Sequence, residues 1–237
     1  MTPLLEIACF NQESAINAAN GGADRIELCR DYASGGLSPA ATTLMELKSQ
    51  ITVPIYVMIR PHSNGFCYDK ESFEIMKTTL SNMRNLGADG FVFGILNPLS
   101  GDSSKSLSSW IDVARNKELV KLAKGKPCTF HRAFDCIPES HWDTALDDLK
   151  GCGFASPTLP NGLIHSNLIP KKSCNPLQII VGGAVRANNV QVLRETSHAQ
   201  AFHSSALISS DETVATSEVE SLRAMLRGNP LQRKSTP

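Results

Sequence analysis

The chain has 237 residues, of which 41% are hydrophobic and 19% are charged. Lysine and arginine together number 23, as do aspartate and glutamate, so the formal net charge is zero and neither nucleic acid nor an anionic membrane is expected as a partner. No apolar run approaches the ~20 residues that span a bilayer, and the N-terminus lacks a basic signal-like segment. We expect a cytoplasmic globular protein with one domain over residues 1–228 and a polar tail over 229–237.

Apolar segments of strand length recur along the chain and alternate with segments of helical period. Phe73, Met76 and Leu80, for example, lie three or four residues apart, as one face of a helix requires. The alternation predicts a parallel sheet covered by helices. The expected strands are Leu4–Phe10, Asp24–Arg30, Pro54–Arg60, Asp89–Leu96, Pro127–Arg132, Phe154–Thr158, Leu177–Gly182 and Gln200–Ser205.

A short motif repeats before alternate strands. Gly22-Ala23-Asp24 precedes the second strand, Gly87-Ala88-Asp89 precedes the fourth 65 residues later, and Gly151-Cys152-Gly153 precedes the sixth after a similar interval. Glycine there fits the left-handed residue that ends a helix. The spacing implies βα units of about 32 residues, and therefore about eight of them, which predicts a (β/α)8 TIM barrel. A doubly wound open sheet is the alternative, but no G-x-G-x-x-G turn follows the first strand.

The pattern is interrupted between residues 155 and 176. Pro157 and Pro160 each remove a backbone donor from the sixth strand, and no helical pattern follows before Pro176. We therefore expect a short or distorted sixth βα unit.

Polar side chains stand at the carboxyl ends of the expected strands, where TIM barrels carry their functional sites. Strand alternation places Glu27 with Cys29 on one face and Glu6 with Ala8 on one face, but it places Cys9 on the opposite face. The candidate binding and catalytic residues at this end are Glu6, Glu27, Cys29, Arg60, His131, Asp135, His203 and Ser204.

These residues allow both structural and functional interpretations. Glu6, Glu27 and Arg60 interrupt hydrophobic strands, so we expect them to neutralise one another, either as a structural ion-pair cluster or while binding a ligand. His131 and Glu27 are candidate general acid or base groups, and His203 is a candidate ligand contact or core histidine. Asp135 could orient His131 or cap the next helix.

Three further features lie near this end of the barrel. Arg132 is one residue out of phase with His131, so we expect it to point toward the helices. Gly182 and Gly183 follow the seventh strand, where small residues let backbone amides approach a phosphate. Ser38 before Pro39 fits the N-cap and first turn of a helix.

Several motifs in one order resemble the CutC copper-homeostasis proteins. They are Glu6-Ile7, Gly22 to Cys29, Gly35 to Pro39, Val57 to Pro61, Gly87 to Gly94, Phe130 to Asp135 and Phe202 to Ala206. The resemblance implies a TIM barrel that is a homodimer or homotetramer, lies in the cytoplasm and in eukaryotes also the nucleus, and binds Cu(I) through cysteines. Cys29 matches the strand-two cysteine of the family, whereas Ala8 stands at the strand-one cysteine and Cys9 is one residue away.

Three functions follow from these observations. The first is copper homeostasis with Cu(I) bound by Cys29 together with Cys9 or Cys67, because Cu(I) prefers at least two thiolates. The second is an enzyme that acts on a small anionic or phosphorylated metabolite, with Glu27 or His131 as the base. The third is a family member whose barrel persists without a working site. The seven cysteines include no Cys-x-x-Cys motif and predict free thiols rather than disulfides.

Overall fold

In a computed structural model of the chain, residues 2–98, 109–160, 177–208 and 212–228 are described. The tail over 229–237, Cys174 and most of the predicted irregular segment 155–176 lie outside the described residues.

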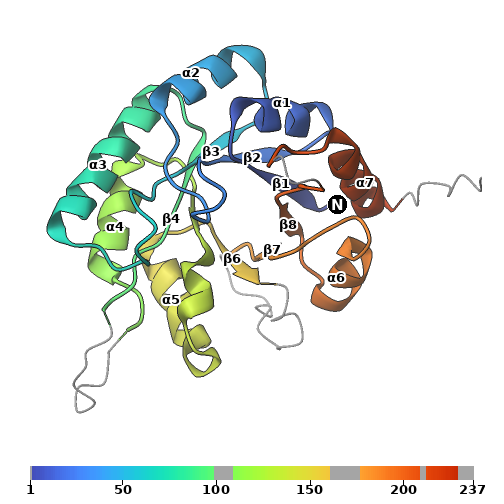
Figure 1. Cartoon of the computed structure of the whole chain (residues 1–237). Helices are drawn as coiled ribbons and strands as arrows, with labels where there is room; N and C mark the ends of the chain where they lie inside the picture. The colour runs from blue at the N-terminus through green and yellow to red at the C-terminus, as the bar shows by residue number, and fades with distance from the viewer. Residues whose placement is uncertain (1, 99–108, 161–176, 209–211, 229–237) are drawn as a thin grey trace, which may run out of the picture.

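Eight parallel strands close into a barrel in chain order, so the predicted TIM barrel is confirmed and the open sheet is excluded (Figure 1). β8 pairs with β1, with Phe202 opposite Leu5, and this pairing completes the ring. The strands are β1 Leu4–Cys9, β2 Arg25–Leu28, β3 Ile55–Met58, β4 Gly90–Phe93, β5 Cys128–Phe130, β6 Ser156–Pro160, β7 Ile180–Gly182 and β8 Ala201–Ser204.

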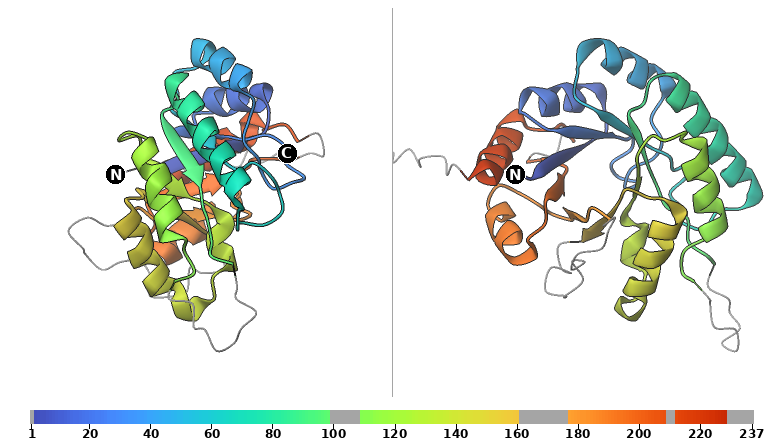
Figure 2. Two further views of the ribbon diagram at one scale, coloured as in Figure 1. Left: turned by 90° about the vertical axis from the view of Figure 1, so that its left-hand side faces the viewer. Right: turned by 180° about the vertical axis from the view of Figure 1, so that it is seen from behind.

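Helices surround the barrel on its outside, as the three views agree (Figures 1 and 2). None of the described helices is long and apolar enough to cross a membrane. They are α1 Gln12–Asn20, α2 Ala41–Gln50, α3 Lys70–Asn85, α4 Val113–Leu122, α5 Trp142–Cys152, α6 Val190–Ser197 and α7 Thr216–Arg227, with short 3-10 helices η1 Arg132–Cys136 and η2 Glu139–His141.

The repeated Gly-Ala-Asp motif has the same structural role at both of its sites. Gly22 and Gly87 have φ angles of 88° and 91°, the left-handed region in which glycine avoids steric strain. The aspartate two residues later accepts a hydrogen bond from the backbone of the preceding strand. Asp24 accepts the Leu5 N–H and Asp89 accepts the Ile55 N–H, both at 2.8 Å. The motif therefore ends a helix and fixes the base of the next strand pair.

The barrel separates two different interiors. Outward side chains of the strands, such as Ile7, Leu28 and Phe91, pack against the helices in one large apolar core. Inside the barrel the only buried apolar cluster among the described residues is small, with Cys29, Met58 and Val92 at its centre. The remaining space inside the strands is shared by charged and hydroxyl side chains, which positions polar groups beneath the mouth of the barrel.

The sixth strand forms in spite of its two prolines. β6 runs from Ser156 to Pro160 and pairs in parallel with β5 and β7. The Ser156 hydroxyl is buried and lies 3.0 Å from that of Thr129 on β5. β6 therefore contributes to the closed ring, while the chain that follows it lies outside the described residues.

Gly90 makes room for a ring inside the barrel. A Cβ atom at this position would lie 2.7 Å from carbons of the Tyr56 ring. We predict that Gly90→Ala lowers the free energy of unfolding by about 1–3 kcal/mol, because the ring must leave its position over Arg25.

Gly151→Ala provides the matched control for this substitution. Gly151 lies near the end of α5 and has open space around its Cβ position, so alanine should stabilise the protein by up to about 1 kcal/mol. Denaturant unfolding measures both changes, and equal effects of the two substitutions would contradict the packing account.

Candidate functional site

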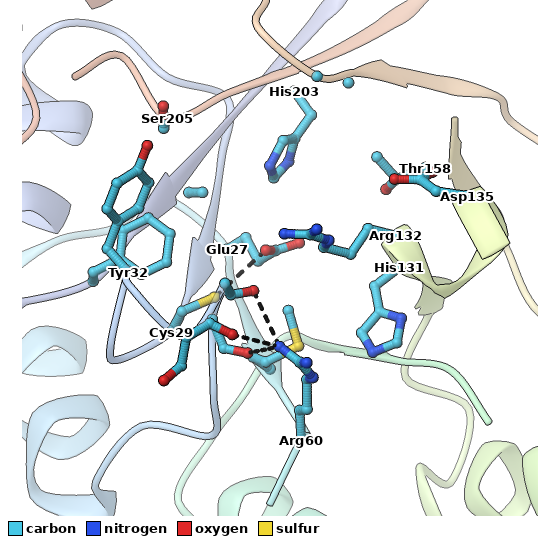
Figure 3. Close-up of a pocket in the computed structure, with 18 of the residues that line it drawn as sticks. Glu27, Cys29, Tyr32, Arg60, His131, Arg132, Asp135, Thr158, His203 and Ser205 are labelled. Carbon is cyan, nitrogen blue, oxygen red and sulfur yellow. Dashed lines mark hydrogen bonds between the residues drawn. The ribbon is translucent and has the colours of Figure 1, made fainter. Parts of the chain in front are cut away.

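A cavity of about 830 Å³ opens at the carboxyl ends of the strands (Figure 3). Its volume lies in the range of small-molecule sites. Most of the residues proposed from the sequence line it together, although they come from five different strands or the loops that follow them. These residues are Glu27, Cys29, Arg60, His131, Asp135, Gly182, Gly183, His203 and Ser204.

Glu6 lies beneath the cavity and is completely buried. The strand register places it opposite Arg25 on β2 and opposite His203 on β8. Its two carboxylate oxygens accept hydrogen bonds from Arg25 Nε at 2.6 Å and His203 Nδ1 at 2.8 Å. Burial alone would raise the pKa of Glu6, but Arg25 and His203 outweigh it and lower the pKa to about 2. Glu6 is therefore a buried anion between two cations.

The predicted mutual neutralisation of Glu6, Glu27 and Arg60 is wrong. Glu6 pairs with Arg25 and His203 instead. Sequence reasoning missed Arg25, although strand alternation places it on the same face of β2 as Glu27. Its guanidinium also lies 4.3 Å from the centre of the Tyr56 ring, which fills the barrel below the cavity.

Glu27 and His203 form the chemical centre of the cavity. One carboxylate oxygen of Glu6, one of Glu27 and one ring nitrogen of His203 lie within 4.8 Å of one another, close enough to hold a metal ion together. Burial would lower the pKa of His203, but Glu27 and Glu6 together raise it to about 9. Burial raises the pKa of Glu27, and His203 opposes that shift. Cys29 donates its S–H to Glu27 Oε1 at 3.5 Å.

Arg60 is buried without a carboxylate partner among the described residues. Its Nη1 donates to the carbonyl oxygens of Ser34 at 2.9 Å and Gly36 at 3.1 Å, so it anchors the β2–α2 loop over the cavity. The predicted N-cap role of Ser38 is wrong, because Ser38 does not cap α2. α2 begins after Ala40, and the Ser38 hydroxyl instead accepts the Arg60 N–H at 2.8 Å.

His131 is a buried neutral side chain in the wall of the cavity. Burial lowers its pKa to about 3, and the charges of Arg60 and Arg132 add to this effect. Its Nδ1 accepts the Ala133 N–H at 3.3 Å, and its Nε2 has no hydrogen-bond partner among the described residues. The described residues show no hydrogen bond between Asp135 and His131, so the predicted orienting role of Asp135 is not seen. Asp135 lies within η1, so it does not cap a following helix either.

Two arginines that line the cavity were not proposed as site residues. Arg132 was expected to point toward the helices, but the chain turns into η1 directly after β5 and directs Arg132 into the cavity (Figure 3). Arg186 follows the Gly182-Gly183 turn and donates to the hydroxyls of Ser204 and Ser205 at 3.2 Å each. A 3-10 turn has no periodic signal, so the direction of Arg132 was not visible in the sequence.

The cysteines of the described residues do not fit a two-thiolate Cu(I) site in this cavity. Cys29 is the only one of them that lines the cavity, while Cys9 packs in the apolar core outside the strands. Burial and the charge of Glu27 raise the pKa of the Cys29 thiol well above its ordinary value, so the thiol stays protonated. A soft Cu(I) ion prefers at least two thiolates.

Comparison with known proteins places the chain in a family. Residues 3–208 match the model of the CutC family. The chain belongs to the CutC family. It is 34% identical to the copper homeostasis protein cutC homologue of Drosophila melanogaster over 88% of this chain and 79% of the relative. It is also 34% identical to the Homo sapiens homologue, over 86% of this chain and 73% of the relative.

Solved structures agree with this placement. The copper homeostasis protein CutC from Streptococcus agalactiae superposes with a TM-score of 0.72 at 27% identity, covering 86% of this chain and 98% of that chain. Phosphoribosylanthranilate isomerase from Thermotoga maritima has a TM-score of 0.63 at 13% identity over 95% of this chain and 99% of its own, a likeness of fold alone. Membership of the CutC family therefore rests on both sequence and structure.

Removal of the Glu6 charge should destabilise the barrel. We predict that Glu6→Gln lowers the free energy of unfolding by about 3–5 kcal/mol, because it leaves Arg25 and His203 buried without their shared anion. Glu220→Gln, which changes an exposed glutamate of α7, should have almost no effect. Denaturant unfolding distinguishes the two, and a Glu6→Gln variant as stable as Glu220→Gln would refute the network.

The raised pKa of His203 gives stability a pH dependence. His203 has a pKa of about 9 in the fold against an ordinary 6.5, so its contribution is fully present below pH 6.5 and is lost as the pH rises through 9. NMR titration should show the His203 ring titrating near pH 9, and Glu27→Gln should lower that pKa. An unchanged pKa in Glu27→Gln would show that Glu27 does not act on His203.

Proposed function

We propose that this member of the CutC family is an enzyme that transfers a proton on a small anionic organic molecule bound in the barrel cavity. The observation that carries the proposal is the closeness of Glu27 and His203, whose carboxylate oxygen and ring nitrogen lie within 4.8 Å of each other. One is a buried carboxylate with a raised pKa, and the other is an imidazolium that its neighbours keep protonated. Groups whose surroundings move their pKa values in this way are typical of acid and base pairs in active sites.

The geometry supports a separate task for each group. Glu27 is the general base, because its carboxylate lies in the cavity wall and its raised pKa makes it a better proton acceptor than an ordinary carboxylate. His203 uses Nδ1 to bind Glu6, which leaves Nε2 to donate a hydrogen bond to an oxygen that gains negative charge during the reaction. Glu6 positions His203 and does not touch the substrate.

Glu27 is a better candidate for the base than His131. The pKa of His131 is about 3, so the ring is a weak base, and Phe66 packs against it with ring centres 5.0 Å apart. Gly94 lies so close to the ring that a Cβ there would be 2.8 Å from Nδ1. These contacts support a role for His131 in shaping the cavity wall.

The charge of the cavity favours an anionic molecule. Arg60, Arg132 and Arg186 all line it, and none of them forms an ion pair with a carboxylate of the described residues. Asp135 also lines the cavity, and burial raises its pKa to about 6 while Arg132 opposes that shift. The surplus of guanidinium groups would attract and orient acidic groups of a substrate.

Cu(I) binding is the second candidate function. The relatives named above are copper homeostasis proteins, and Cys29 supplies one thiol to the cavity beside Glu27. Titration of the reduced protein with Cu(I) against a competing chelator tests it directly. Tight binding that Cys29→Ser abolishes would support this candidate, whereas weak binding that the substitution leaves unchanged would exclude a site at Cys29.

Proton exchange with solvent tests the proposed enzyme. We predict that the wild-type protein, incubated in D2O with a panel of hydroxy acids, keto acids and sugar phosphates, introduces deuterium into at least one of them. Mass spectrometry detects the gain. Glu27→Gln should abolish the exchange, since the amide cannot accept the proton, while the same compound still binds.

His131→Gln is the matched comparison for the choice of base. It should keep most of the exchange, because the ring shapes the wall and takes no proton. Exchange that survives in Glu27→Gln but disappears in His131→Gln would reverse the assignment. A panel without any exchange or binding would refute the enzyme proposal.

A further inference from the structure

We infer that the ligand of this cavity carries two acidic groups, one at each end of a short carbon chain, and that the cavity binds them at two separate arginine subsites. This inference rests on the proposed function and names its substrate class. It follows from the way in which the three guanidinium groups are distributed around the mouth, and from which of their atoms still lack partners.

The first subsite lies at Gly35, where Arg60 and Arg132 converge. A Cβ atom built on Gly35 would lie 2.9 Å from Arg132 Nη1 and 3.7 Å from Arg60 Nη1, so both guanidinium groups reach one point of the β2–α2 loop. Two like charges held this close repel each other unless an anion lies with them. A carboxylate or phosphate accepts from such a pair with favourable geometry.

The Arg60 side chain shows that this subsite is incomplete. Arg60 is only 5% exposed, and its Nε has no hydrogen-bond partner among the described residues. The nearby His131 is 3% exposed and has an Nε2 in the same condition. A buried charged donor without a partner costs free energy, so an acceptor supplied by a ligand would complete the site. Arg132 is exposed and can move toward that ligand.

The second subsite lies at the β7–β8 corner and is organised around Arg186. Its Nη1 donates to the Val185 carbonyl at 2.8 Å and to Ser204 Oγ, and its Nη2 donates to Ser205 Oγ. The Ser204 hydroxyl is held in turn by the Val185 carbonyl at 2.7 Å. These contacts fix the guanidinium beside the small residues Gly182 and Gly183 without neutralising its charge.

The barrel order separates the two subsites and places the reactive pair between them. Arg186 follows β7, which lies opposite β3, the strand that Arg60 follows, in the closed ring. Arg132 follows β5, two strands from β7, but its guanidinium reaches Gly35 in the β2–α2 loop. Glu27 on β2 and His203 on β8 belong to the wall that connects them. A molecule that binds at both ends would therefore hold its central carbons against Glu27 and His203. Short phosphocarboxylates, bisphosphates and dicarboxylates have this chemistry.

Calorimetric titration with matched ligands tests the inference. The pairs are glycerol 3-phosphate with 3-phosphoglycerate, and ribose 5-phosphate with ribulose 1,5-bisphosphate, in which only the second member has two acidic groups. We predict that at least one two-acid member binds the wild-type protein at least about tenfold more tightly than its partner, since it forms a second set of charge-assisted hydrogen bonds. Inorganic phosphate is the single-anion reference.

Variants then assign the two ends. Arg132→Met and Arg186→Met should each remove that gain, because each leaves one subsite intact, while Arg227→Met on the exposed face of α7 should change nothing. Equal binding of both members of each pair, or a gain that persists in Arg132→Met, would overturn the inference and leave single-anion binding standing. Failure of every anion to bind would refute the proposed function as well. Two-acid binding without deuterium exchange would refute only the proposed catalysis.

Discussion

The buried Glu6 carboxylate organises the interior of the barrel. It is fully buried, and the pairing register of β1 with both of its neighbours places one cation on each side of it. The cost of burying three charges is offset only while all three remain together. Because Glu6 fixes Nδ1 of His203, it also determines which nitrogen of that ring faces a ligand. The stability of the fold and the chemistry of the cavity thus depend on one carboxylate.

The charges of the barrel are balanced at depth and unbalanced at the mouth. At the floor of the cavity, His203 and the underlying Arg25 both have the Glu6 carboxylate within hydrogen-bond distance. At the mouth, Arg60 is bound by loop carbonyls and Arg186 by hydroxyls, neither of which cancels a positive charge. The paired charges at the floor hold Glu6 and His203 in place. The arginines at the mouth, which lack carboxylate partners among the described residues, would attract an anion. The two layers therefore have different tasks.

Membership of the CutC family and the geometry of the cavity point to two different ligands, copper and an organic anion. Relatives in the fly and in humans have the copper-homeostasis name, and the solved bacterial structure has the same barrel. Within this chain, Ala8 lines the cavity where a second thiol would be required, and Cys9 faces the helices. The three arginines that line the cavity support the proposed anionic ligand instead. Copper binding and anion chemistry consequently make separable predictions for Cys29 and Glu27.

The barrel was predictable from the sequence, because the alternation of apolar strand segments with helical segments and the Gly-Ala-Asp repeat are local signals. The alternation of side chains along the first strand also placed Cys9 on the face opposite Glu6. The partners of Glu6 and Arg60 were not predictable in this way, since they depend on strand register and on the path of the β2–α2 loop. The direction of Arg132 depended on the turn after β5. Partners of long charged side chains are set by residues distant in the sequence, and no local pattern encodes them.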